Sequence, residues 1–172
     1  MNNADLIIRT LTSAGVTHGF GIPSGNALPL LEAMRAGGME FALTAHEGSA
    51  GFCADVMGRL GKAPGFCFST MGPGASNLAT GVGCAYLDRS PLIAITCNVA
   101  SGDLDRRVQM RIDHHALFGP ITKASLALKP GNIARTLTQA LSLTMTEPQG
   151  PVHLDLPEDV ALFIAQEDVP QL

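Results

Sequence analysis

The chain has 172 residues, of which 46% are hydrophobic, so it can form one globular domain with a sizeable core and is not a disordered tail. Only 15% of the residues are charged, against roughly 25% in a typical soluble domain, which predicts a surface partly covered by another chain in a homodimer or higher oligomer. The formal net charge is -4, and Lys and Arg cluster only at Arg106, Arg107 and Arg111, which excludes nucleic-acid binding.

The apolar periodicity predicts helices and strands in alternation along the chain. The expected elements are a helix at 3–14, a strand at 18–21, a helix at 27–35, a strand at 40–44, a helix at 47–60, a strand at 65–70, a helix at 74–86, strands at 92–97 and 125–128, a helix at 132–146 and a strand at 152–156. Strands that are apolar on both faces are typical of parallel sheets covered by helices. We therefore expect a doubly wound α/β fold, with a mainly parallel six-stranded sheet and helices on both faces. Residues 1–160 form the predicted domain, and residues 161–172 a tail or the start of a linker.

The four cysteines lie in apolar segments and lack the paired spacing of a metal site, so we expect buried, reduced thiols and no metal ligands. They are Cys53, Cys67, Cys84 and Cys97. The N-terminus has no secretion signal, and no apolar run reaches the ~18 residues of a membrane helix. The expected location is the cytoplasm, without membrane insertion.

The stretch at 100–120 interrupts the alternation because it is polar and charged. Long irregular connections in compact domains are more often functional than idle. It contains Gln109 and the adjacent pair His114 and His115. Histidine changes charge near neutral pH and can handle protons, although adjacent histidines in a polar loop are more often solvated or capping residues.

Three turns after predicted strands, at 21–25, 44–48 and 70–77, are rich in small residues. In an open parallel sheet, ligands bind at the carboxyl ends of the strands, so a flat ligand could approach the backbone there. The turn Gly72-Pro73-Gly74 lacks both the G-K-S/T ending of a P-loop and the spaced glycines of a dinucleotide site. Two interpretations stay open for it: a tight turn made for backbone reasons, and a close wall against a ring.

Glu47 follows the strand at 40–44 and begins the helix at 47–60. A carboxylate in the first turn of a helix is stabilised by the helix dipole, which is the simplest interpretation. Its neighbours Gly48, Ser49 and Ala50 are small and uncharged. That setting also suits a carboxylate that shares a proton with a ring nitrogen of a ligand.

Seven strings in collinear order resemble the acetolactate synthase and 2-oxo acid decarboxylase group of thiamine-diphosphate-dependent enzymes. They are G-F-G-I-P-S-G at 19–25, A-H-E-G-S-A-G-F-C-A-D at 45–55, G-R-L-G-K at 58–62, T-M-G-P-G-A-S-N at 70–77, A-Y-L-D-R-S-P-L at 85–92, F-G-P-I-T-K at 118–123 and G-P-V-H-L-D-L-P-E-D-V at 150–160. The resemblance is to the N-terminal, pyrimidine-binding domain. Three positions depart from the acetolactate synthase pattern: Ile22 replaces a tyrosine or phenylalanine, Ser24 replaces a glycine, and Gly119 replaces an arginine.

The resemblance implies that Glu47 is catalytic and hydrogen-bonds N1′ of the aminopyrimidine of thiamine diphosphate. It implies a substrate-side role for Gln109, His114 and His115. It also implies that the cofactor-binding residues lie in the three turns: Pro23, Ser24, Gly25, Glu47, Thr70, Gly72, Pro73, Gly74 and Asn77.

The family's magnesium and diphosphate site uses a G-D-G...N motif, which this chain lacks, so the resemblance implies a partner domain or subunit that holds Mg²⁺. The implied reaction is that of a lyase or carboligase acting on a small 2-oxo acid. Three alternatives stay open: the small subunit of a two-subunit decarboxylase of the sulfopyruvate decarboxylase type, a non-catalytic homologue that acts as a binding or regulatory module, and an unrelated α/β module that binds a planar ligand.

Overall fold

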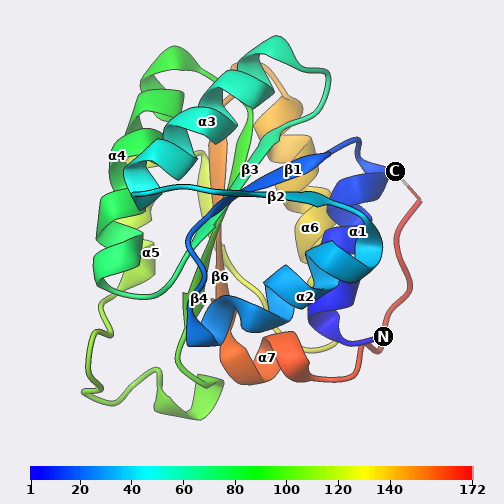
Figure 1. Ribbon diagram of the computed structural model, residues 1–172, viewed down its shortest axis with the longest axis vertical. Coiled ribbons are helices and arrows are strands. Elements are labelled where there is room, and N and C mark those ends of the chain that lie inside the picture. Colours follow the sequence, from blue (N-terminus) through cyan, green and yellow to red (C-terminus); the bar gives the residue numbers. More distant parts are fainter. Residues whose placement is uncertain (172) are drawn as a thin grey trace.

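The computed structural model describes residues 1–171 and consists of helices and strands in alternation (Figure 1). The strands are β1 (His18–Gly21), β2 (Glu40–Leu43), β3 (Gly65–Ser69), β4 (Leu92–Asn98), β5 (Ala124–Ala127) and β6 (Pro151–Pro157). The α-helices are α1 (Asn3–Ser13), α2 (Leu28–Gly37), α3 (Glu47–Leu60), α4 (Pro73–Asp88), α5 (His114–Phe118), α6 (Ile133–Met145) and α7 (Glu158–Leu162). Three short 3₁₀ helices are η1 (Gly25–Ala27), η2 (Ser101–Asp103) and η3 (Gly119–Ile121).

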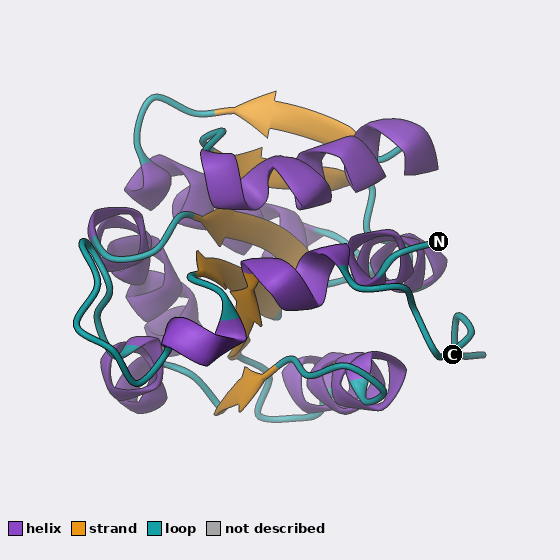
Figure 2. Ribbon diagram, turned by 90° about the horizontal axis from the view of Figure 1, so that it is seen from below, coloured by secondary structure: helices purple, strands orange, loops and turns teal. Residues whose placement is uncertain are grey.

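All six strands are parallel and pair in the order β2-β1-β3-β4-β6-β5, which confirms the predicted doubly wound sheet. Figure 2 shows helices on both sides of the sheet. One core lies between the sheet and α1, α2, α6 and α7, and a second lies between the sheet and α3, α4 and α5. Every residue of β3, β4 and β6 is buried, as expected for central strands, whereas β2 is an exposed edge strand.

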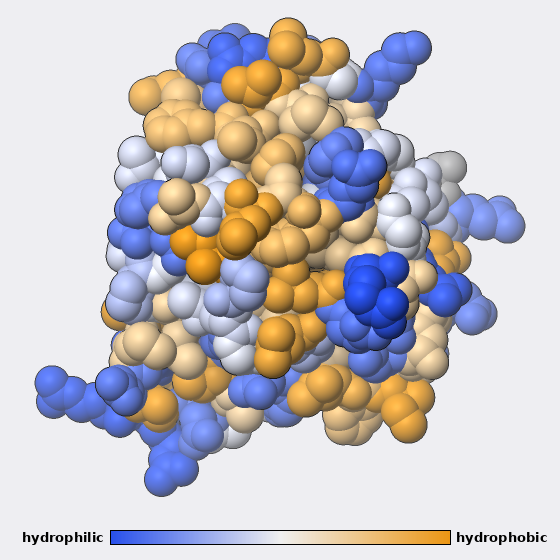
Figure 3. Space-filling model, in the orientation of Figure 1, coloured by the Kyte–Doolittle hydropathy of each residue, from blue (hydrophilic) through white to orange (hydrophobic). Residues whose placement is uncertain are grey.

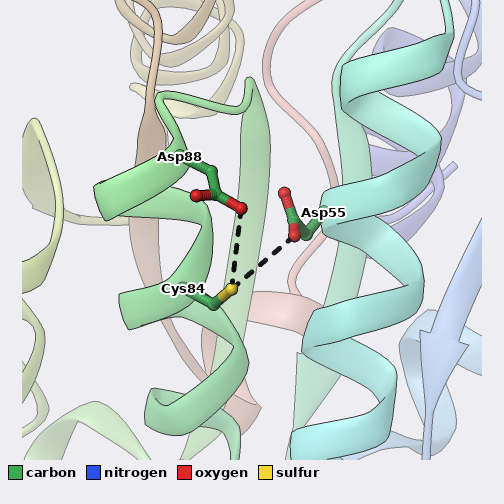
Figure 4. A group of neighbouring side chains, drawn as sticks. All are labelled: Asp55, Cys84 and Asp88. Carbon is green, nitrogen blue, oxygen red and sulfur yellow. Dashed lines mark hydrogen bonds between the residues drawn. The ribbon is translucent and has the colours of Figure 1, made fainter.

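The helices α3 and α4 pack with their backbones in close approach. A Cβ atom built on Gly51 would lie 2.8 Å from Cα of Gly81, so a larger side chain at either glycine would push the helices apart. The same pair of helices is joined by a cluster of ion pairs and thiol hydrogen bonds, of which Figure 4 draws Asp55, Cys84 and Asp88. Arg59 contacts Asp55 of its own helix at 2.7 Å and Asp88 of α4 at 3.1 Å.

Cys84 completes the cluster, since its thiol lies between the two carboxylates at 3.9 Å from Asp55 and 3.8 Å from Asp88 (Figure 4). Desolvation and the two negative charges raise the pKa of Cys84, so the thiol stays protonated and acts as a donor. Because the Arg59 guanidinium pairs with both carboxylates, we interpret the group as a structural link between the two helices.

Most predicted element bounds agree with the structure, and the segment at 100–120 is more ordered than expected. It contains η2, η3 and α5, whose first turn is capped because the Asp113 side chain accepts a hydrogen bond from the amide of Ala116. The predicted burial of the cysteines is right for Cys67 and Cys97 but wrong for Cys53, which faces outward from α3, and Cys84 is only partly buried. No helix among the described residues is long and apolar enough to cross a membrane.

The segment after residue 160 packs against the domain as far as the structure describes it. The carbonyl of Phe163 accepts a hydrogen bond from the amide of Asn3 at 2.9 Å, and the Glu167 carboxylate accepts one from the amide of Ile133 at 2.6 Å. The position of the domain boundary within a longer protein stays a prediction.

Candidate functional site

The carboxyl ends of β2, β1 and β3 meet at one edge of the sheet, and the three turns predicted to bind a ligand follow these strands. β1 pairs with β2 on one side and with β3 on the other, so the direction of winding reverses beside it. The helix after β1 packs on one face of the sheet and the helix after β2 on the other. Ligands of open α/β sheets bind in the crevice at such a reversal.

Glu47 is the first residue of α3 and is only 8% exposed. Its Oε2 atom accepts a hydrogen bond from Nδ2 of Asn77 on α4 at 3.0 Å. Its Oε1 atom accepts no hydrogen bond from the part of the chain that the structure describes. The side chain of the preceding His46 caps the helix by accepting from the amide of Gly48. One carboxylate oxygen is thus held by Asn77, and the other has no hydrogen-bond donor within residues 1–171.

The turn before α4 brings its backbone against Glu47. A Cβ atom on Gly74 would lie 3.1 Å from Oε1 of Glu47 and 2.7 Å from Cγ2 of Thr70, so only glycine fits there without displacing a neighbour. Gly72 has a φ of +58°, and a Cβ atom on it would collide with the carbonyl of Met110. Of the two interpretations left open by the sequence, the close approach of this turn to Glu47 favours the wall.

Asn26 is a member of the site that sequence reasoning missed. Its Oδ1 atom accepts hydrogen bonds from the hydroxyls of Ser24 at 3.0 Å and Thr70 at 2.9 Å, and so joins the turn after β1 to the turn after β3. Its Nδ2 atom is buried and has no partner among the described residues. The only available signal was the position of Asn26 next to the predicted turn at 21–25. Pro23 and Gly25 lie exposed in that turn.

The structure separates the three residues predicted on the substrate side. His114 is buried and contacts the site through its Nε2 atom, which accepts a hydrogen bond from the amide of Gly72 at 3.3 Å. His115 is exposed, and its Nδ1 atom lies 2.7 Å from the Ser125 hydroxyl. Gln109 is exposed in the loop before α5, and no hydrogen bond joins it to another predicted site residue within residues 1–171.

A cavity of about 480 Å³ lies beside His114, at the carboxyl ends of β4, β6 and β5. His115, Arg111 and Lys129 line it together with apolar side chains such as Leu104 and Ile112. It adjoins the predicted site, because His114 contributes to the cavity wall and also contacts the Gly72 turn.

Comparison with known proteins shows which family this chain is similar to. The family model described as thiamine pyrophosphate enzyme, N-terminal TPP binding domain, matches residues 1–117. The chain is 41% identical to a probable acetolactate synthase large subunit of Methanocaldococcus jannaschii over 93% of its length. It is 37% identical to an acetolactate synthase of Bacillus subtilis over 91%, and 37% identical to a probable 2-ketoarginine decarboxylase of Pseudomonas aeruginosa over 90%. It covers only 27% of the first of these proteins and 28% of the other two.

Proposed function

Because this chain belongs to the thiamine pyrophosphate enzymes, as their N-terminal, pyrimidine-binding domain, we propose that Glu47 activates the aminopyrimidine of thiamine diphosphate in an enzyme that acts on a 2-oxo acid. The proposed activity is that of a lyase or carboligase of the acetolactate synthase type. The observation that carries the proposal is the geometry of Glu47, with one oxygen fixed by Asn77 and the other open beside Gly74.

The residues present fit the aminopyrimidine half of the cofactor. Glu47 offers an open acceptor atom, and Asn26 offers a buried donor without a partner, among the described residues, at the same crevice. The missing side chain at Gly74 lets the backbone of this turn lie directly against Oε1 of Glu47, so the turn borders the open acceptor atom. When bound, thiamine diphosphate supplies a nucleophilic thiazolium carbon and an electron sink for the loss of carbon dioxide from a 2-oxo acid.

Glu47 would share a proton with N1′ of the pyrimidine at its open Oε1 atom. The hydrogen bond from Asn77 keeps the carboxylate from rotating, so that Oε1 stays directed at the crevice. Gly72, Pro73 and Gly74 would form the wall against one face of the ring, with Thr70, Ser24, Pro23 and Gly25 around it. The glutamate is needed because it can change its protonation state, which an amide cannot do.

The chain would hold only part of an active site. It spans little more than a quarter of the relatives it matches, so a further domain or subunit is implied. We propose that this partner binds Mg²⁺ and the diphosphate. The cytoplasm is the proposed location, because all four cysteines are free, as is usual in reducing compartments.

A second copy of the chain is the proposed occupant of an apolar surface over α3 and β2. Figure 3 shows hydrophobic residues gathered over this part of the face. Several large hydrophobic side chains are exposed there: Phe41, Leu43, Phe52, Val56, Met57 and Leu60. Monomeric proteins rarely leave a contiguous patch of this kind open, and its position next to Glu47 fits a site completed between subunits.

On the substrate side we propose His115 and Gln109, which are exposed. Both ring nitrogens of His114 already hydrogen-bond to protein groups, so in place of its predicted contact with substrate we propose an indirect role.

The proposal is tested by Glu47→Gln in the complete protein that carries this chain. We expect loss of nearly all turnover of 2-oxo acids, with the fold and most of the affinity for thiamine diphosphate retained, because Gln keeps a hydrogen bond but cannot transfer the proton. Glu40→Gln is the matched control, since Glu40 is an exposed residue at the opposite end of β2. Normal turnover of Glu47→Gln would refute the proposal.

A further inference from the structure

A chain of polar side chains runs through the core from the protein surface to the Gly72 turn. It begins at the exposed His115, whose ring contacts the Ser125 hydroxyl at 2.7 Å, and continues from Ser125 to Nδ1 of His153 at 2.7 Å. Nε2 of His153 lies 2.8 Å from the hydroxyl of Thr96, which in turn donates to Asp155 at 3.0 Å. The last member, His114, contacts Asp155 through Nδ1 at 2.7 Å.

The geometry gives every hydrogen bond in this chain a direction. The amide of Gly72 can only donate, so Nε2 of His114 carries no proton and Nδ1–H donates to Asp155. The carboxylate of Asp155 can only accept, so the Thr96 hydroxyl donates to it and accepts from Nε2–H of His153. Nδ1 of His153 then accepts from Ser125. The hydrogen bonds donated by His114 and Thr96 thus both end at Asp155, and the bond from His153 to Thr96 is directed toward it.

Asp155 is only 4% exposed, and both of its carboxylate oxygens accept hydrogen bonds from neighbouring side chains. Nδ2 of Asn98 donates to both of its oxygens, at 3.1 and 2.9 Å. Burial alone would raise the pKa of Asp155, but the hydrogen bonds from His114 and Asn98 outweigh it and lower the pKa. His153 is fully buried and stacks on Phe118 with ring centroids 4.3 Å apart, and desolvation lowers its pKa to about 3, so it is a neutral member of the chain.

The end of this chain reaches the proposed cofactor site. The ring of His114 accepts a hydrogen bond from the amide of Gly72, which begins the turn to α4. In this turn Gly74 lies so near Glu47 that a Cβ atom on it would be 3.1 Å from Oε1. The same turn opens α4, which carries Asn77, the donor to Glu47. A shift of Gly72 would therefore move both groups that orient the Glu47 carboxylate.

We propose that Asp155 and His114 are positioning residues that fix the Gly72 turn, and through it Glu47, while Thr96 and His153 hold Asp155 in its accepting orientation. This inference rests on the proposed function of Glu47. A proton is not expected to pass from His114 to the cofactor, because a peptide amide ends the chain.

The test is an exchange of two residues in the complete protein. Asp155→Asn places an amide against Nδ2 of Asn98, so two donors face each other and the acceptor for His114 is disturbed. The double variant Asn98→Asp with Asp155→Asn restores the pairing, because the new carboxylate would accept from the new side-chain amide and from the backbone amide of Val99, which Asn98 already serves. The double variant keeps the composition and the net charge. Asp168→Asn is the control, because Asp168 is exposed and lies outside this chain of hydrogen bonds.

For Asp155→Asn we expect kcat to fall and the half-saturating thiamine diphosphate concentration to rise, each about 10-fold or more, with the KM of the 2-oxo acid within about twofold of wild type. The double variant should recover most of both losses, and Asp168→Asn should lose little. If Asp155→Asn does not fold, the double variant must fold and show near-wild-type kcat. A double variant as impaired as the single one, or an Asp155→Asn enzyme with unchanged kcat and cofactor affinity, would overturn the inference.

A measurement without cofactor separates this inference from the proposed function. ¹⁵N NMR of histidine-labelled protein at neutral pH should show His114 with a protonated Nδ1 and a bare Nε2, and Asp155→Asn should lose this tautomer preference. The opposite tautomer in the wild type would sink the positioning role alone. A wild-type protein that shows the expected tautomer but never binds thiamine diphosphate would instead end the proposed function, and the inference with it.

Discussion

Substitution of Gly74 by alanine tests the close approach of the turn to Glu47. The new methyl group would lie 2.7 Å from Cγ2 of Thr70 and 3.1 Å from Oε1 of Glu47, so both must shift. Overpacking of this kind costs ~1–3 kcal/mol. Gly74 lies in the first turn of α4, where alanine returns up to ~1 kcal/mol of helix propensity. The middle of these ranges gives a net destabilisation of about 1.5 kcal/mol, which lowers Tm by ~3–6 °C in a domain of this size.

The matched control for Gly74→Ala is Gly83→Ala in the same helix. A Cβ atom at Gly83 has no neighbour closer than 4.0 Å, so the variant should gain ~0.5–1 kcal/mol and melt slightly higher than wild type. Differential scanning fluorimetry of the complete protein compares the two, and titration with thiamine diphosphate and Mg²⁺ should show weaker binding, by about 10-fold, for Gly74→Ala only. Equal stability and equal cofactor affinity of the two variants would refute the steric argument.

Three further outcomes are expected. Arg59→Met should lower the free energy of unfolding by ~3 kcal/mol in denaturant titrations, because it leaves the buried Asp55 without its counter-charge; a loss below ~1 kcal/mol would contradict this role. A maleimide reagent should label the exposed Cys53 before Cys84, whose pKa is raised, and assembly of the complete protein should protect Cys53 if α3 meets a second copy; mass spectrometry reads both effects. Burial lowers the pKa of His153 from 6.5 to about 3 in the folded protein. As the pH falls below 6.5, the unfolded chain therefore binds a proton at His153 that the folded protein does not, and the free energy of unfolding decreases. The loss from this group should reach ~2 kcal/mol at pH 5, at ~1.4 kcal/mol per unit, and His153→Gln should flatten the dependence.

The fold could be predicted from the sequence because the apolar runs and the turn residues indicate the same bounds for the strands and helices. The strand at 18–21 and the helix at 47–60 have the predicted bounds, since Gly, Pro and the strand-to-helix turn mark their ends. The short helix α5 could not be predicted, because five residues show no periodicity and the helix depends on the cap from Asp113. α7 also escaped prediction, although Val160 and Ala161 are buried, because its apolar face is only one turn long.

In the proposed site, Glu47 and the turn at Gly72 could be predicted, because the residue type and the position directly after a strand can both be read from the sequence alone. The role of Asn26 was hidden, since it depends on a hydrogen bond to Thr70, 44 residues away in the chain. Asp155 and Thr96 were missed for the same reason: a polar residue inside an apolar strand shows its partners only when the strands are paired.

The contact between Gly51 and Gly81 bears on the rigidity of the proposed cofactor site. Glu47 lies one turn before Gly51 on α3, and Asn77 lies one turn before Gly81 on α4. The carboxylate and its amide donor are therefore carried by two helices whose backbones pack directly against each other. This close packing keeps α3 and α4 from moving relative to each other, so the Glu47 carboxylate and the Asn77 amide stay in contact. In the proposed enzyme, any opening and closing that admits a substrate would therefore come from the partner domain or subunit, while this domain stays rigid.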